Sequence, residues 1–234
     1  MLILAFETSA KAASVALLRD GELLGEYFQH SGQTHSRTLT KMAEDLLRNC
    51  DLSPKDVDAV ACAAGPGSFT GVRIGVAASI GFAWAGEKPC YGISTLEAMA
   101  RNVAVADGVI CAAMDARRSQ VYTALFSVES GVMTRLMPDS AISVDELAAQ
   151  LEKIEKEKIL VGDGAALCYN EMSKRGISVR LMPEHLRMQR AAGVAILAWE
   201  QYLAGYTPTG GELVPNYLRL SQAERERQKQ MNTD

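Results

Sequence analysis

A glycine-rich segment, GPGSFTG at residues 65–71, is the part of the sequence with the clearest potential for chemistry. It joins a hydrophobic run at residues 57–64 to an apolar run of helical character at residues 72–86. A strand, a glycine turn and a helix N-terminus can form a phosphate cradle, because free backbone N–H groups and the helix dipole point at the anion. The members of this candidate phosphate-type loop are Gly65, Gly67, Ser68, Thr70 and Gly71.

The usual phosphate-binding patterns are incomplete in this loop. A P-loop needs a Lys and a Ser or Thr after its last glycine, whereas Val72 and Arg73 follow here. The dinucleotide pattern needs a third glycine where Thr70 stands. The loop is therefore either part of an unusual nucleotide fold or a turn shaped for another purpose.

Other catalytic arrangements have little support. Ser68 and Thr70 have no His or Lys nearby in the sequence that could accept a proton. The three histidines are His30, His35 and His185, and the spacing of the first two does not stack them on one helix face. We therefore predict no catalytic residue, no bound metal and no cofactor.

Composition and charge limit the class of protein. The 234 residues suit one large domain or two small ones, and the net charge of −4 gives no bulk attraction to nucleic acid. The five cysteines form no C-x-x-C pair, which is typical of reduced thiols in a cytosolic protein. Residues 1–6 start a hydrophobic strand without a basic leader, and the apolar run at 72–86 is too short to span a bilayer. We expect a cytoplasmic protein.

The elements that would position the glycine loop occur twice in the same order. Each half reads as three strands, a helix, a further strand, a glycine turn and a second helix. Such a meander followed by helix-linked strands implies a mixed sheet with helices on its faces. We predict an α/β fold of two RNase H-like lobes. The expected divisions are an N-terminal lobe at 1–104, a C-terminal lobe at 105–221 whose helix 189–204 packs on the first lobe, and a polar tail at 222–234.

A stripe of small residues follows the glycine loop at intervals of four. Glycine inside a helix costs about 1 kcal/mol relative to alanine, so the stripe implies close packing. Two interpretations remain open: the stripe packs on the protein's own sheet, or it meets the equivalent helix of a partner. The stripe consists of Gly71, Gly75, Ser79 and Ala83.

Five motifs, in order along the chain, carry a specific resemblance. The duplicated plan is similar to that of the actin, sugar-kinase and DnaK-type ATPases, and the motif series resembles the TsaB (YeaZ) family of tRNA threonylcarbamoyladenosine biosynthesis proteins. The motifs are ETS at 7–9, HS at 35–36, GPGSFTGVRIG at 65–75, DARRSQVY at 115–122 and PNYLR at 215–219.

The resemblance implies a non-catalytic dimerisation subunit that activates a TsaD-like transferase. A TsaE-like P-loop ATPase would complete the complex, tRNA would be held indirectly through these partners, and the isolated chain could form a homodimer. The small-residue stripe would then be the partner interface. The catalytic homologue has two metal-binding histidines where Thr95 and Met99 stand here. A threonine hydroxyl is a poor ligand and a thioether suits only soft metals.

The first turn, Glu7, Thr8 and Ser9, resembles a vestigial nucleotide-binding turn. Glu7 and Asp115 begin corresponding places in the two halves, where an active ATPase would hold Mg²⁺; the alternative is that Glu7 satisfies its own turn. Two other functions stay open. One is a free-standing ATPase or small-molecule kinase, and the other is a metallopeptidase.

Overall fold

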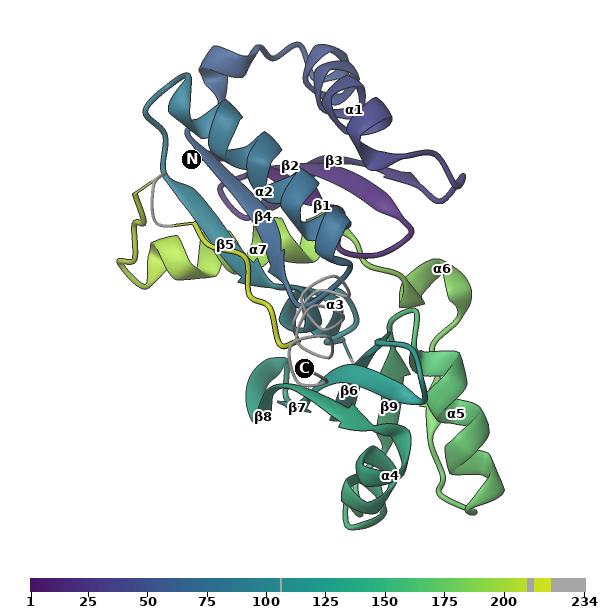
Figure 1. Cartoon of the computed structure of the whole chain (residues 1–234). Coiled ribbons are helices and arrows are strands. Elements are labelled where there is room, and N and C mark those ends of the chain that lie inside the picture. Colours follow the sequence, from purple (N-terminus) through teal and green to yellow (C-terminus); the bar gives the residue numbers. More distant parts are fainter. Residues whose placement is uncertain (106, 210–212, 220–234) are drawn as a thin grey trace, which may run out of the picture.

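Two five-stranded mixed sheets organise the protein (Figure 1). The computed structural model describes residues 1–105, 107–209 and 213–219. Helices flank both sheets, which confirms the predicted α/β class. Within the described residues, no helix is long and apolar enough to cross a membrane.

The first sheet has the strand order β3-β2-β1-β4-β5. Its central strand β1 runs antiparallel to β2 and parallel to β4. Alternate residues of β1 point to opposite faces, so Leu4 joins one apolar core and Ile3 joins another. The strands are β1 (Leu2–Glu7), β2 (Ala13–Arg19), β3 (Glu22–Gln29), β4 (Ala59–Gly65) and β5 (Cys90–Ser94).

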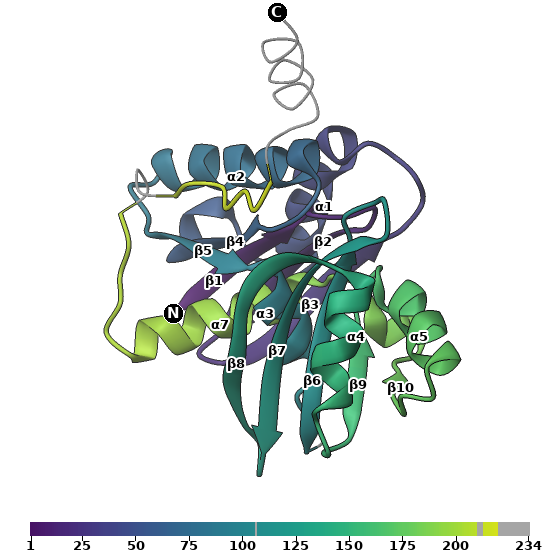
Figure 2. The same cartoon turned by 60° about the horizontal axis from the view of Figure 1, so that its bottom comes forward.

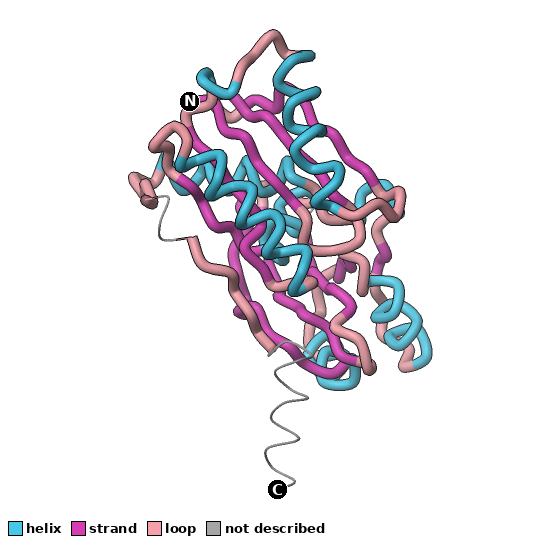
Figure 3. Tube along the Cα trace, turned by 45° about the horizontal axis from the view of Figure 1, so that its top comes forward, coloured by secondary structure: helices cyan, strands magenta, loops and turns pink. Residues whose placement is uncertain are grey.

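Helices cover both faces of this sheet. Helices α1 (His35–Asn49) and α2 (Phe69–Trp84) lie on one face, as Figure 3 shows, and a short 3-10 turn (Pro54–Asp56) links α1 to β4. The opposite face is covered by α7 (Ala191–Leu203), which packs on β1, β2 and β4. The chain therefore returns from its C-terminal part to complete the first sheet.

The second sheet has the strand order β10-β9-β6-β7-β8. Helices α4 (Val144–Glu152) and α5 (Ala165–Lys174) pack on one face, and α3 (Thr95–Asn102) contributes Leu96 and Met99 to the core on the other. The strands are β6 (Gly108–Asp115), β7 (Gln120–Glu129), β8 (Val132–Ser143), β9 (Lys158–Val161) and β10 (Arg180–Leu181), with a short helix α6 (Glu184–Arg187) after them.

The last described segment, residues 213–219, runs back along the first sheet beside α2 (Figure 2). We call this segment the C-terminal strap. Its Leu213 is buried in the core that α1 and α2 share with the sheet. The predicted polar tail at 222–234 lies outside the described residues.

Candidate partner-binding site

The glycine loop lies between β4 and the first turn of α2. Ser68 caps the helix, and its Oγ accepts a hydrogen bond from the Gly71 N–H at 3.3 Å. The Ser68 N–H donates to the Ser9 carbonyl at 2.7 Å. The peptide bond between Gly65 and Pro66 is cis. The Ser68 and Gly71 N–H groups are therefore bonded within the protein rather than free for an anion.

The β1–β2 turn presses against this loop, so the structure brings two of the predicted sites together. The Thr8 hydroxyl donates to the Gly71 carbonyl at 2.8 Å. A Cβ at Gly67 would lie 2.6 Å from the Ser9 carbonyl oxygen, and one at Gly75 would lie 2.5 Å from Thr8 Oγ1. Both positions need glycine because the turn comes so close.

The C-terminal strap covers the other side of the loop. The Asn216 N–H donates to the Ala64 carbonyl at 2.6 Å, at the end of β4. Gly65 has a φ of +115°, and any side chain there would also collide with the Asn216 carbonyl oxygen. This contact could not be predicted from the sequence, since the two positions are far apart in the chain.

An aromatic and cationic stack fixes the strap to the start of α2. The Tyr217 and Phe69 rings lie 4.8 Å apart, Arg73 Nε donates to the Tyr217 hydroxyl at 2.9 Å, and the Arg73 guanidinium lies 3.7 Å above the Phe69 ring. Beyond it, Arg219 Nη1 donates to the Ala116 carbonyl at 3.0 Å. The PNYLR motif thus ties the first helix after the loop to the β6–β7 turn of the second lobe.

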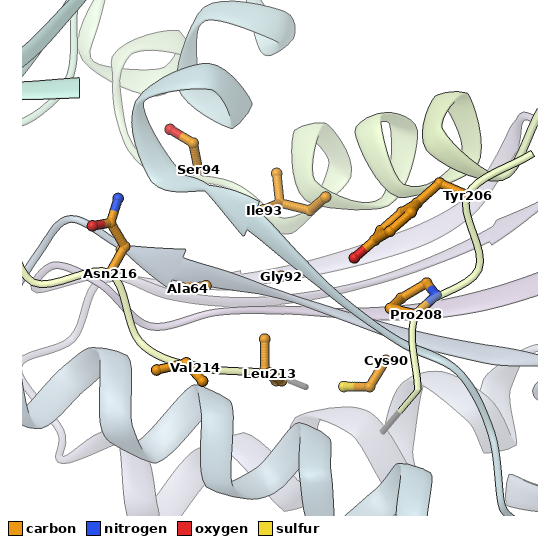
Figure 4. Close-up of a pocket in the computed structure, with 11 residues that line it drawn as sticks. Ala64, Cys90, Gly92, Ile93, Ser94, Tyr206, Pro208, Leu213, Val214 and Asn216 are labelled. Carbon is orange, nitrogen blue, oxygen red and sulfur yellow. The ribbon is translucent and has the colours of Figure 1, made fainter. Parts of the chain in front are cut away.

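A cavity of about 240 Å³ lies between the strap and the edge strand β5 (Figure 4). Among the described residues, no charged side chain lines it. Burial raises the pKa of the Cys90 thiol to about 12, so this lining residue stays protonated at neutral pH and is a poor nucleophile. The described lining therefore gives no specific support for catalysis in this cavity.

The small-residue stripe on α2 is part of the protein's own core. Its four members are buried against the β1–β2 turn and the first sheet. They therefore have no surface left for a partner, and the prediction that they form the partner interface is wrong. The residues concerned are Gly71, Gly75, Ser79 and Ala83.

The opposite side of α2 is exposed and also apolar. Trp84 is 84% exposed and Ile80 is 36% exposed. Ala77 and Gly81 are also exposed, and a Cβ at Gly81 would meet no atom within 4 Å. With Arg73 toward the start of the helix, these five residues form what we call the outer face of α2. A helix that is apolar on both sides is typical of one buried between two bodies.

Glu7 is fully buried at the end of β1 and accepts a hydrogen bond from the Ser9 N–H at 2.6 Å. Burial raises the pKa of the Glu7 carboxyl to about 7, although the contacts with Ser9 oppose that rise. The Asp115 carboxylate is exposed and accepts from the Arg117 N–H at 2.7 Å. Glu7 therefore satisfies its own turn, as the second interpretation of this residue required.

The positions that correspond to the two metal-binding histidines of the catalytic homologue are buried. Thr95 opens α3 and Met99 lies one turn later in the second-lobe core. His35 Nε2 bonds to the Ala10 carbonyl at 2.7 Å, while His30 and His185 are exposed elsewhere. Across the described ranges, no three His, Cys, Asp or Glu side chains converge as a metal site would require.

Comparisons with known proteins agree with this geometry. The chain matches, over residues 28–226, the protein family described as "TsaD: tRNA N6-adenosine threonylcarbamoyltransferase". It is 32% identical to the tRNA threonylcarbamoyladenosine biosynthesis protein TsaB of Bacillus subtilis, covering 96% of both chains. It is 30% identical to the protein of the same name from Escherichia coli, covering 94% of this chain and 95% of that one.

Solved structures show the same relationship. YeaZ from Pseudomonas aeruginosa superposes with a TM-score of 0.76 at 26% identity, over 93% of this chain and 99% of that one. Component A of the (R)-2-hydroxyglutaryl-CoA dehydratase of Acidaminococcus fermentans shares the fold alone, with a TM-score of 0.52 at 12% identity, over 87% of this chain and 99% of that one. On the matched family and the full-length identity to its curated relatives, the chain belongs to the TsaB (YeaZ) family.

Proposed function

We propose that this chain is the non-catalytic dimerisation and activating subunit of a cytoplasmic complex that makes threonylcarbamoyladenosine in tRNA. Its direct partner is a TsaD-like transferase, a TsaE-like P-loop ATPase joins them, and tRNA is held through the partners. The relatives' names supply the pathway. The observation that carries the pairing is the outer face of α2.

The chemistry of that face suits a second helix. Ala77 and Gly81 are four residues apart, so a partner helix can approach the backbone closely. Trp84 and Ile80 on the same face provide exposed apolar area that a partner can bury. A TsaD-like protein has the same duplicated fold, so its equivalent helix can pack here in a pseudo-symmetric pair. A second copy of this chain can use the same face when the partner is absent.

Two observations support a subunit without catalysis of its own. Thr95 and Met99 are packed in the interior and offer no pair of metal ligands. The glycine loop is covered by the Ser9 turn and by Asn216, so a nucleotide phosphate has no open cradle there. The same cover argues against a free-standing ATPase or kinase.

Reconstitution tests this function. Purified TsaD-like and TsaE-like proteins, unmodified tRNA and the threonylcarbamoyl donor are combined with and without this chain, and modified adenosine is quantified by mass spectrometry. We expect modification to depend on this chain. Equal rates without it would rule the activating role out.

A further inference from the structure

The turn between β6 and β7 carries two arginines in an unfavourable backbone conformation. Arg117, Arg118 and Ser119 have φ angles of +65°, +55° and +54°. Residues with a Cβ rarely adopt this left-handed region, so three in succession are strained. Strain of this kind persists only where the surrounding structure fixes it, and it occurs most often at sites that contact a ligand. We call residues 115–119 the arginine turn.

Hydrogen bonds from several parts of the molecule hold the backbone of the arginine turn. The Asp115 carboxylate accepts from the Arg117 N–H at 2.7 Å, and the first residue of α4 donates its N–H to the last carbonyl of the turn at 3.1 Å. From the C-terminal strap, Arg219 Nη1 donates to the Ala116 carbonyl at 3.0 Å. All these bonds use backbone groups of the turn or its Asp115 carboxylate, and none uses the side chain of either arginine in it.

The positive charge of the turn is not neutralised within the described residues. The side chains of both arginines in the turn are exposed and have no ion pair or hydrogen bond there, and Arg219 has no acidic partner. Asp115 is bonded to the turn's own backbone, and Asp145 of α4 pairs with Arg175. This leaves Glu146 of α4 unpaired near three arginines, on a chain whose net charge is −4.

The side chains at this place suit a nucleic acid. The planar guanidinium group of arginine can donate two parallel hydrogen bonds to the oxygens of one phosphate. Two residues before Arg219, the strap exposes 39% of Tyr217, whose ring offers a surface on which an unpaired base can stack. Arginines beside an exposed aromatic ring are typical of surfaces that follow a single-stranded nucleic acid, and an acidic peptide would use the arginines alone.

We propose that the arginine turn binds the sugar–phosphate backbone of the tRNA that the complex modifies. The inference rests on the proposed function, in which the partners hold the tRNA, and it adds one direct contact from this chain. Arg117 and Arg118 each bind a phosphate, and Arg219 positions the turn. So few contacts are too weak to hold tRNA without the partners, because each phosphate contact contributes little at physiological salt.

Binding of tRNA by this chain assembled with its TsaD-like partner tests the contact. Fluorescence anisotropy of labelled, unmodified tRNA at several salt concentrations gives the Kd and its salt dependence. Arg117→Gln/Arg118→Gln should weaken binding about three- to tenfold and reduce the slope of log K against log salt by roughly 1 for each lost phosphate contact. Arg19→Gln/Lys55→Gln is the matched control, because it removes two exposed charges near the starts of β1 and β4, whereas the strap crosses the end of β4.

Two further variants separate binding from folding. Arg118→Gly removes one charge and places glycine at a left-handed position, so it should weaken tRNA binding without lowering the melting temperature. Arg117→Lys/Arg118→Lys keeps both charges and should retain most of the affinity, since the salt-dependent attraction to phosphate persists.

Equal tRNA affinity and salt dependence for the glutamine variant and its control would overturn the contact and leave the activating role intact. Unchanged tRNA affinity together with lost binding of the TsaE-like protein would also overturn it, because the turn would then face an acidic protein surface. Conversely, a wild-type chain that raises tRNA affinity through the arginine turn but does not increase modification would support the contact and refute the proposed function.

Discussion

Gly75 and Gly81 lie on the same helix but face opposite surroundings. Gly75 contacts Thr8 inside the first lobe, and Gly81 faces open space. This difference defines which side of α2 is available to a partner.

A pair of leucine substitutions measures the difference. Gly75→Leu should destabilise the chain by about 1 to 3 kcal/mol or more, because its Cβ would lie 2.5 Å from Thr8 Oγ1, which is itself bonded to Gly71. Gly81→Leu should leave the melting temperature within a few degrees of wild type, because nothing lies within 4 Å. Thermal unfolding followed by circular dichroism reports both. A folded Gly75→Leu with unchanged stability would contradict the packing described.

At the residue scale, the sequence shows the chemical type of each side chain but not its long-range contacts. Because ligand identity is a local property, Thr95 and Met99 could be recognised as poor metal ligands from their side chains alone. The need for glycine at position 65 could not be predicted in the same way. It comes partly from the nearby carbonyl oxygen of Asn216, which lies far away in the sequence.

Helix α2 shows why an element's orientation was harder to predict than its existence. Small residues recur at intervals of four on both of its sides, as 71, 75, 79 and 83 inside and as 77, 81 and 85 outside. Apolar residues on both sides remove the one-sided pattern that normally identifies the buried face. The amphipathic helix α1 has no such ambiguity: its apolar residues fall on one side at helical spacing, and that side, which includes Leu39 and Leu46, is the buried one.

A charged side chain on the outer face of α2 should weaken partner binding without unfolding the chain. Trp84→Glu places a carboxylate at the most exposed apolar position of the helix, so binding to a TsaD-like partner should weaken at least about tenfold while the isolated chain stays folded. Isothermal titration calorimetry measures the affinity. Val132→Glu, at a 66% exposed apolar position on β8, is the control and should bind like wild type. Equal binding by both variants would place the partner on another surface.

The strap offers a matched pair of neighbouring side chains. Leu213 is 8% exposed in the first-lobe core, and Val214 is 72% exposed. Leu213→Ala should therefore lower the free energy of unfolding by about 2 to 4 kcal/mol, whereas Val214→Ala should change it by less than about 0.5 kcal/mol. Urea unfolding gives both values. Similar values for the two variants would mean that the strap does not complete the core.

At the scale of the whole molecule, the duplicated order of elements predicted the architecture. The two sheets have equivalent strand orders, β3-β2-β1-β4-β5 and β8-β7-β6-β9-β10 read in the same sense. Hairpin turns and helix caps specify such elements locally, which is why they could be predicted. The division between the lobes near residue 104 stays a prediction.

The covered glycine loop leads to an expectation for the isolated chain. Titration with Mg-ATP should give no binding heat attributable to the loop, because Ser9, Asn216 and the loop's own cap bond its neighbouring backbone groups. Calorimetry at millimolar nucleotide tests this. Micromolar binding accompanied by hydrolysis would favour the free-standing ATPase, and the same titration on the assembled complex distinguishes a site that needs the partner.

The position of α7 and the strap in the chain has a consequence for synthesis. Helix α7 and the strap complete the first lobe, yet they follow the whole second sheet in the sequence and are therefore synthesised after it. The second sheet, at residues 108–181, is continuous in sequence and can assemble while the first sheet still lacks the helix that covers one of its faces. The nascent first lobe therefore presents one uncovered face of strands such as β1 and β4 until α7 has been made, and this exposed apolar surface can aggregate during synthesis.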